Sequence, residues 1–170
     1  MYLPHAFEVN DVAWIDAFIR EQAAADLVTI DDQGQPVSTL MPCSWYRRDD
    51  SHGTLVMHMA RGNQQWKSIA EGARGLAIIH GPQAYVTPSW YESKVEHGKV
   101  VPTWNYTAVH LSGSVAVSHD QDHLRSIVSD LTDLHEAGRS TPWAVADAPE
   151  EYLAGQLKAI VAVTLHVDRI

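Results

Sequence analysis

Cysteine is almost absent from this sequence of 170 residues, which contains only Cys43. A single thiol cannot form an internal disulfide, and it cannot supply a cysteine-based zinc site. Long apolar runs are also lacking, because segments such as Ala159–Val163 and Leu76–Ile79 have the length of strands and not of membrane-spanning helices. The first residues show no basic region followed by an apolar stretch, so they predict no signal peptide. We therefore expect a soluble cytoplasmic protein without a membrane partner.

Basic residues are scarce: 12 Lys and Arg stand against 21 Asp and Glu, which gives a formal charge of −9 with His neutral. A chain with this charge repels the phosphate backbone of nucleic acids and anionic lipid. The sequence also shows no helix-turn-helix and no basic face. We therefore do not expect direct DNA binding.

The ring-bearing residues are unevenly represented, with two Phe against six Trp, six Tyr and ten His. Rings with a polar atom are typical of half-wet sites and interfaces. The length fits one domain spanning residues 1–170.

The apolar periodicity predicts six or seven strands with helices between them. Asp11 is a candidate N-cap for a first helix, Asp120 or Asp122 for a helix reaching about Ala137, and Pro149 fits the first turn of a last helix. Short turns between several neighbouring strands favour an antiparallel sheet or barrel over a doubly wound parallel sheet. The expected strands cover residues 26–30, 37–46, 54–60, 76–80, 84–87, 104–118 and 159–167, and a short helix is expected over residues 64–71.

The segment 58–66 reads as a strand that turns directly into this short helix. The N-terminus of a helix has unpaired N–H groups and the positive end of the dipole, which favour a phosphate. Arg61 adds a forked cationic donor, and Asn63 and Gln64 add neutral donors. A capped helix beside a strand, with no ligand, is the simpler alternative.

An aromatic stretch follows, in which five of the Phe, Trp and Tyr residues fall between positions 85 and 106. Such rings suit stacking on a planar ligand or a subunit interface, and they also suit a core beneath a long loop. The sequence leaves these alternatives open. The residues are Tyr85, Trp90, Tyr91, Trp104 and Tyr106.

Other candidate residues have simpler interpretations. His58 and His110 alternate with apolar residues in strands, where a histidine with a satisfied hydrogen bond is expected unless a ligand lies alongside. His119 and His123 are four residues apart but lack the intervening Glu of a hydrolytic zinc helix, so no metal site is predicted. Cys43 lies in a strand and is expected to be buried.

The sequence contains no Gly-x-Ser-x-Gly, Gly-x-x-x-x-Gly-Lys or Gly-x-Gly-x-x-Gly motif. No pair of carboxylates stands out from the acidic background. The residues therefore indicate a ligand site but identify no catalytic residue.

Four motifs together resemble the PaiB family of FMN-binding negative transcriptional regulators, and they occur in the family's order over nearly the whole chain. They are Met1-Tyr2-x-Pro4, His58-Met-Ala-x-Gly-Asn63-x-Gln65-Trp66, Gly81-Pro82-x-Ala-Tyr85-Val-x-Pro-Ser89-Trp90-Tyr91 and Val101-Pro102-Thr103-Trp104-Asn105-Tyr106-x-Ala108-Val109-His110.

The resemblance implies a mainly β, α+β fold: a six-stranded antiparallel Greek-key split β-barrel that forms homodimers and binds FMN at the subunit interface. In the wider group, which includes pyridoxine 5′-phosphate oxidases, the flavin lies along one hairpin strand and the next strand-to-helix turn. The oxidases have basic residues at the turn that holds the phosphate, whereas this chain has Asn63-Gln64-Gln65 with Arg61 nearby, so phosphate binding is expected to be weaker. The positions implied are Ser38, Thr39, Leu40, Met41, His58, Met59, Ala60, Arg61, Asn63, Gln64 and Gln65, with Trp104, Asn105 and His110 as contributors from the partner chain or beside the ring.

Two functions follow from the resemblance. The first is a flavin-dependent sensor or negative regulator that acts on transcription indirectly. The alternative is a flavin-dependent oxidoreductase of the same barrel, with His58 or His110 as proton donor, or a variant that binds or degrades haem.

Overall fold

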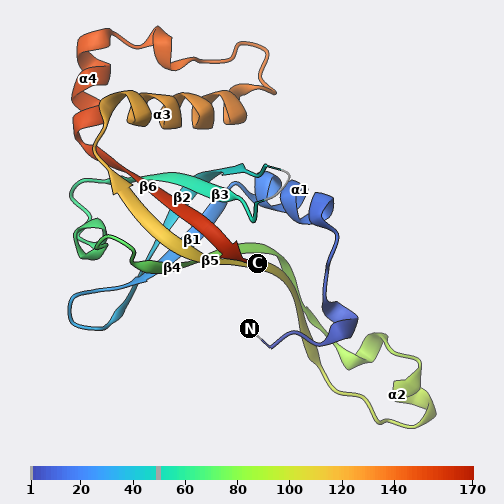
Figure 1. The fold of residues 1–170 in the computed structure, drawn as a ribbon. Helices are drawn as coiled ribbons and strands as arrows, with labels where there is room; N and C mark the ends of the chain where they lie inside the picture. The colour runs from blue at the N-terminus through green and yellow to red at the C-terminus, as the bar shows by residue number, and fades with distance from the viewer. Residues whose placement is uncertain (1, 49–50) are drawn as a thin grey trace.

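The computed structural model describes residues 2–48 and 51–170, in which six strands form a closed antiparallel barrel with helices outside it (Figure 1). Met1 of the N-terminal motif and positions 49–50 lie outside the described residues. The expected antiparallel barrel with flanking helices is thus confirmed. The strands are β1 (Ala24–Ile30), β2 (Pro36–Tyr46), β3 (Thr54–Ala60), β4 (Arg74–Val86), β5 (Thr103–Ser118) and β6 (Ile160–Arg169).

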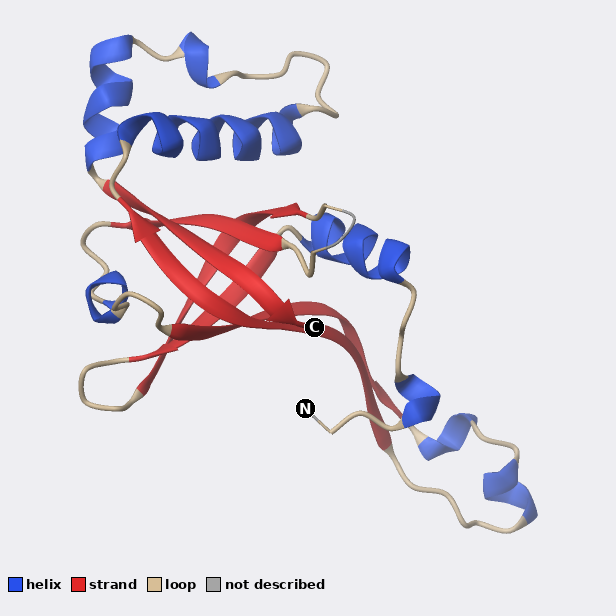
Figure 2. Cartoon of the chain, viewed as in Figure 1, coloured by secondary structure: helices blue, strands red, loops and turns tan. Residues whose placement is uncertain are grey.

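Most of the helices lie outside the barrel, as Figure 2 shows, and among the described residues none is long and apolar enough to cross a membrane. The α-helices are α1 (Val12–Gln22), α2 (Ser93–Glu96), α3 (Gln121–Glu136) and α4 (Glu150–Lys158). Short 3-10 turns are η1 (His5–Phe7), η2 (Gln65–Ser68), η3 (Pro88–Trp90) and η4 (Val145–Asp147).

The barrel consists of two three-stranded meanders joined by the connection over residues 61–73. Pairing of β1 with β4 and of β3 with β6 closes the ring in the order β1-β2-β3-β6-β5-β4. Alternate residues of each strand point inward, as the period of two requires. In β3, for example, Leu55, Met57 and Met59 are buried in the core, and Cys43 of β2 is buried there as expected.

Strands β4 and β5 continue beyond the barrel as a two-stranded ribbon, and residues 81–107 are called the arm below (Figure 1). The expectation of two separate strands at 76–80 and 84–87 was wrong, because β4 is continuous. Pro82 lacks an N–H, but the pairing with β5 tolerates it as a register shift between His80 and Gln83. The bulge also meets α1, since a Cβ on Gly81 would lie 2.6 Å from the ring of Phe18.

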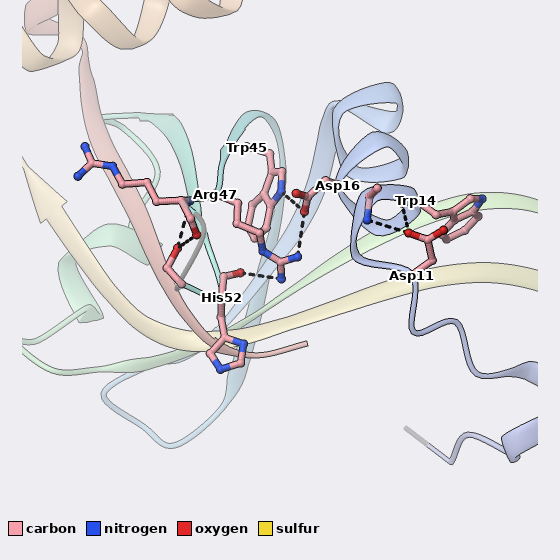
Figure 3. Close-up of polar contacts among 9 residues, drawn as sticks. Asp11, Trp14, Asp16, Trp45, Arg47 and His52 are labelled. Atoms are coloured by element: carbon pink, nitrogen blue, oxygen red, sulfur yellow. Dashed lines mark hydrogen bonds and ion pairs between the residues drawn. The ribbon is translucent and has the colours of Figure 1, made fainter.

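A polar cluster attaches α1 to the barrel (Figure 3). Asp11 caps the helix by accepting hydrogen bonds from the N–H groups of Ala13 and Trp14, as expected of an N-cap. One turn later, Asp16 Oδ1 accepts a 2.9 Å hydrogen bond from Trp45 Nε1 and lies 3.2 Å from Arg47 Nη1. Both charged side chains of this ion pair are largely buried.

Helices α3 and α4 form a separate layer over the outer face of β2, β3 and β6, with a small apolar core of their own. Asp120 is the N-cap of α3 and accepts a hydrogen bond from the N–H of His123. Pro149 is the N-cap residue of α4 and not its first helical residue, so the last helix begins one position later than expected.

The helix expected over residues 64–71 is only a four-residue 3-10 turn, η2. Gln65 and Trp66 of this turn and the following Ile69 face the protein: Gln65 is buried, and Trp66 and Ile69 pack on the barrel core. The helix N-terminus that the phosphate interpretation assumed is therefore a short turn without a substantial dipole.

Candidate functional site

Among the described strands, one edge of β2 is unpaired along part of its length, although the ring of strands is closed. This strand pairs with β1 through residues 36–42 but with β3 only through residues 43–46. Within the described part of the chain, no strand therefore pairs with the second edge of β2 over residues 36–42. Backbone groups on such an edge are available to another segment or to a ligand.

Side chains of the connection after β3 fill the space beside this open edge. Asn63 Nδ2 donates to Thr39 Oγ1 at 2.9 Å, and Thr39 Oγ1 donates to Gln65 Oε1 at 2.5 Å. Asn63 Oδ1 accepts from the N–H of Gln65 at 2.9 Å, which closes the network. Each of these side-chain oxygens and nitrogens is thereby fixed in orientation.

Gln65 lies at the centre of the network and is buried. Its Nε2 donates to the carbonyl oxygens of Leu27 at 2.9 Å and Val37 at 3.3 Å and to Thr29 Oγ1 at 3.1 Å. Because a buried amide must satisfy its polar atoms, these partners make Gln65 a support for the site.

Between the open edge and the connection lies a surface hollow of ≈ 450 Å³. Its walls offer hydroxyl and amide groups, one aliphatic side chain and one carboxylate. The residues that line it are Asp31, Val37, Ser38, Thr39, Asn63, Gln64, Gln65 and Ser68.

The electrostatics of the hollow are neutral to negative. Asp31 supplies a carboxylate, whose Oδ1 accepts hydrogen bonds from the N–H groups of Gln33 and Gln35 in the β1–β2 turn. No Lys or Arg of the described residues lines the hollow. The two nearby cations lie at the Trp66 ring instead, with Arg61 Cζ at 6.0 Å and Lys67 Nζ at 5.7 Å from its centroid.

Arg61 also donates hydrogen bonds to main-chain carbonyl oxygens. Its Nε donates to Lys158 O at 2.8 Å and its Nη2 to Ile160 O at 3.0 Å. In this arrangement Arg61 stabilises the junction between α4 and β6, and its guanidinium does not face the hollow.

Five of the predicted residues meet at the hollow: Ser38, Thr39, Asn63, Gln64 and Gln65. Leu40 lies one residue along β2, with an exposed side chain. Met41 and Met59 point into the barrel core, so only their backbone groups could reach a ligand.

His58 does not have the satisfied hydrogen bond that the sequence suggested, since its buried Nδ1 has no partner. Burial also lowers the pKa of its imidazole. The histidine lies on β3 opposite Ala162, a residue of the small core beneath α3 and α4. Packing of the helical layer, which the sequence of β3 cannot reveal, accounts for this burial.

The structure does not bring Trp104, Asn105 and His110 to the hollow of the same chain. Trp104 and Asn105 pair with Tyr85 and Ala84 in the arm, which projects away from the barrel (Figure 2). His110 lies on β5 opposite Ile78.

Three lining residues were not predicted: Asp31, Val37 and Ser68. Asp31 and Val37 flank the turn that leads into β2, so the short turn between the expected strands 26–30 and 37–46 carried a usable signal for both. Ser68 had no such signal, because only the 3-10 geometry of η2 places it toward the hollow.

A family model described as "Putative FMN-binding domain" matches residues 1–169. A Bacillus subtilis protein named "Protease synthase and sporulation protein PAI 2" is 32% identical over 170 residues, covering 100% of this chain and 78% of that protein. An uncharacterized protein of Emericella nidulans is 32% identical over 146 residues, covering 71% of this chain. The chain spans only 58% of that fungal relative.

Solved structures share the fold at low identity. An FAD and haem binding protein from Mycobacterium smegmatis superposes with a TM-score of 0.64 at 20% identity, covering 94% of this chain and 68% of that one. A conserved hypothetical protein from Mycobacterium tuberculosis gives a TM-score of 0.67 at 14% identity, covering 99% of this chain and 87% of that one. These likenesses show that the barrel is a split barrel of the same fold.

Proposed function

The chain belongs to the FMN-binding domain family whose model spans residues 1–169, and from this premise we propose that it is a flavin-binding split-barrel protein. The observation that carries the proposal is the hollow between the open edge of β2 and the 61–68 connection. Its position matches the hairpin strand and following turn that the family resemblance implies for the cofactor.

The residues present fit the neutral parts of a flavin. Thr39, Asn63 and Gln64 offer hydroxyl and amide groups, and the backbone of residues 36–42 offers further donors and acceptors. Such groups suit the polar edge of a flavin ring and the hydroxyls of its ribityl chain. A bound flavin would supply electron-transfer chemistry, and this chain would supply binding and orientation.

We also propose that the protein acts as a homodimer whose interface includes the arm. The arm exposes several large apolar and aromatic side chains, which is unusual for an isolated soluble chain. A second subunit would cover them and bring Trp104 and Asn105 toward the partner's flavin. The exposed side chains are Tyr85, Trp90, Val95, Val101 and Trp104.

The proposed biological role is a flavin-dependent sensor that represses transcription indirectly and acts in the cytoplasm. Direct contact with DNA is disfavoured by the charge of −9, which repels a phosphate backbone. A sensor can instead act through a protein partner or through metabolite levels.

The alternative role is that of an oxidoreductase. His110 is half-buried, and its pKa is lowered by desolvation and then by nearby positive charge, including His80. A lowered pKa disfavours the protonated imidazole that a proton donor needs, so the sensor remains the first proposal.

The test is the visible absorption spectrum of the purified protein, followed by titration with FMN. We expect flavin bands, or quenching of FMN fluorescence that saturates with protein. Thr39→Val should weaken binding because it removes the hydroxyl that contacts both Asn63 and Gln65, whereas Thr132→Val on α3 is the matched control. A Soret band would favour the haem variant, NADH-dependent bleaching would favour the oxidoreductase, and no binding of FMN would refute the proposal.

A further inference from the structure

We propose that the hollow recognises the neutral part of a flavin and not its phosphate, so that riboflavin and FMN bind with similar affinity. This inference rests on the proposed flavin function and specifies the ligand class of the same site. It is carried by the charges around the hollow.

In the part of the chain that the structure describes, the lining of the hollow carries no positive charge. Hydroxyl and amide side chains make up most of the polar wall, and the single charged group on it is the carboxylate of Asp31. A phosphate dianion near this carboxylate is repelled, whereas the neutral hydroxyls of a ribityl chain are not. The overall charge of −9 adds to the repulsion.

Arg61 and Lys67, which are close in sequence to the lining residues, have other partners. Arg61 donates to the carbonyls of Lys158 and Ile160 and lies at Trp66, so moving it would leave those carbonyls without this donor. Lys67 Nζ also lies over Trp66 and not in the hollow.

The backbone of η2 also offers little to a phosphate. The turn η2 has four residues, and the N–H of Gln65 is already bonded to Asn63 Oδ1. This N–H is therefore not free for a phosphate, and a single 3-10 turn lacks the dipole of a longer helix.

The test is titration of riboflavin and of FMN with the full chain at low and at high salt. Quenching of the flavin fluorescence reports binding. A charge-assisted contact to phosphate ordinarily strengthens binding by about ten- to a hundredfold. We expect instead that the two dissociation constants agree within about threefold and that FMN binding does not weaken as salt rises, because salt screens the repulsion between the phosphate and the acidic protein.

Two variants sharpen the test. Gln64→Lys places a cation on the rim and should raise the ratio of the FMN affinity to the riboflavin affinity by about tenfold, because only FMN carries a phosphate. Asp31→Asn keeps an oxygen that can accept the turn hydrogen bonds, and it should favour FMN by roughly threefold. Ser126→Lys, on an exposed position of α3, makes the same charge change as Gln64→Lys and should alter neither affinity.

A salt-sensitive preference for FMN of about thirtyfold or more would overturn this inference, because it would show that a cation holds the phosphate. In that case Lys67→Ala identifies whether the exposed lysine supplies it. Failure of both flavins to bind would instead refute the proposed function, so the two failures are distinguishable.

Discussion

Asp16 contacts both Trp45 and Arg47 with one carboxylate oxygen, and this side chain supplies polar contacts that attach α1 to the barrel (Figure 3). Asp16→Ala leaves a largely buried guanidinium without its counter-charge, so we expect a loss of about 3 kcal/mol in the free energy of unfolding. Urea denaturation measures it. Arg139→Ala, which breaks the more exposed pair with Glu136, should cost less than about 0.5 kcal/mol.

The double variant Asp16→Ala, Arg47→Met checks the cause. Removing the guanidinium as well removes the unpaired buried charge, so part of the lost stability should return. Equal stability of the single and double variants would show that the hydrogen bond to Trp45, and not the ion pair, holds α1.

His58 makes the stability of the fold depend on pH. Burial lowers its pKa from the ordinary value of 6.5, so the unfolded state binds the proton more readily than the folded state. As far as His58 determines it, the free energy of unfolding is therefore highest above pH 6.5 and decreases as the pH falls below that value. His58→Leu, which needs no proton, should show a smaller fall in the urea midpoint between about pH 7.5 and pH 5.5.

The pKa of His110 is lowered in the same direction, so the fall should become smaller without disappearing. His123→Gln, at an exposed position of α3, should retain the full fall seen in the unchanged protein. An equal fall in the His58→Leu variant would mean that His58 is not a source of the pH dependence.

At the residue scale, the sequence predicted which residue types gather at the site better than it predicted what each one does. Thr39, Asn63 and Gln64 line the hollow. The amide nitrogen of Gln65 instead donates hydrogen bonds to Leu27, Thr29 and Val37. These partners lie at least 28 positions away along the chain, so no local pattern could reveal them. The carbonyl partners of Arg61 are equally remote.

At the scale of elements, the junction of β5 and β6 depends on Gly113. A Cβ at this position would lie 1.9 Å from the carbonyl oxygen of His166, at the register shift between the strands. Because backbone atoms cannot move aside like a flexible side chain, Gly113→Ala should destabilise the protein by about 2 kcal/mol or more. Thermal or urea unfolding measures the change.

Gly155→Ala is the matched control for this substitution. Gly155 lies in α4 with no atom within 4 Å of the added Cβ, so alanine should stabilise the helix by about 0.5 to 1 kcal/mol. Destabilisation by both substitutions would contradict the steric explanation for Gly113.

Elements with a strong period were predictable to within a few residues. The helix capped by Asp11, the strand Thr54–Ala60 and the long strand β5 all appear where expected. One error falls where tertiary pairing overrides a local signal, since β5 keeps β4 continuous through Gly81 and Pro82. The other is the expected helix at 64–71, of which only the 3-10 turn η2 forms.

At the scale of the whole molecule, alternating apolar residues and short turns were sufficient to predict an antiparallel barrel. They could not predict that only four residues of β2 pair with β3. The rest of this edge of β2 lies beside the 61–73 connection, whose path the strand pattern does not specify. The arm was likewise visible only as a ring-rich segment. Its projection from the barrel argues against one of the alternatives left open, a core beneath a long loop, since most of its rings are exposed.

The arm therefore supplies the prediction about assembly. Trp90 and Val95 are 72% and 90% exposed, and a buried Trp commonly dominates an interface. The pair Trp90→Ser, Val95→Ser should raise the dissociation constant of the proposed dimer by about thirtyfold or more without changing the barrel. Light scattering during size-exclusion chromatography measures the first effect, and circular dichroism checks the second. Tyr152→Ser, 61% exposed on α4, should leave the dimer intact. An unchanged dimer in the double variant would place the interface on another face, whereas a monomer that also loses flavin would indicate that the partner's arm completes the site.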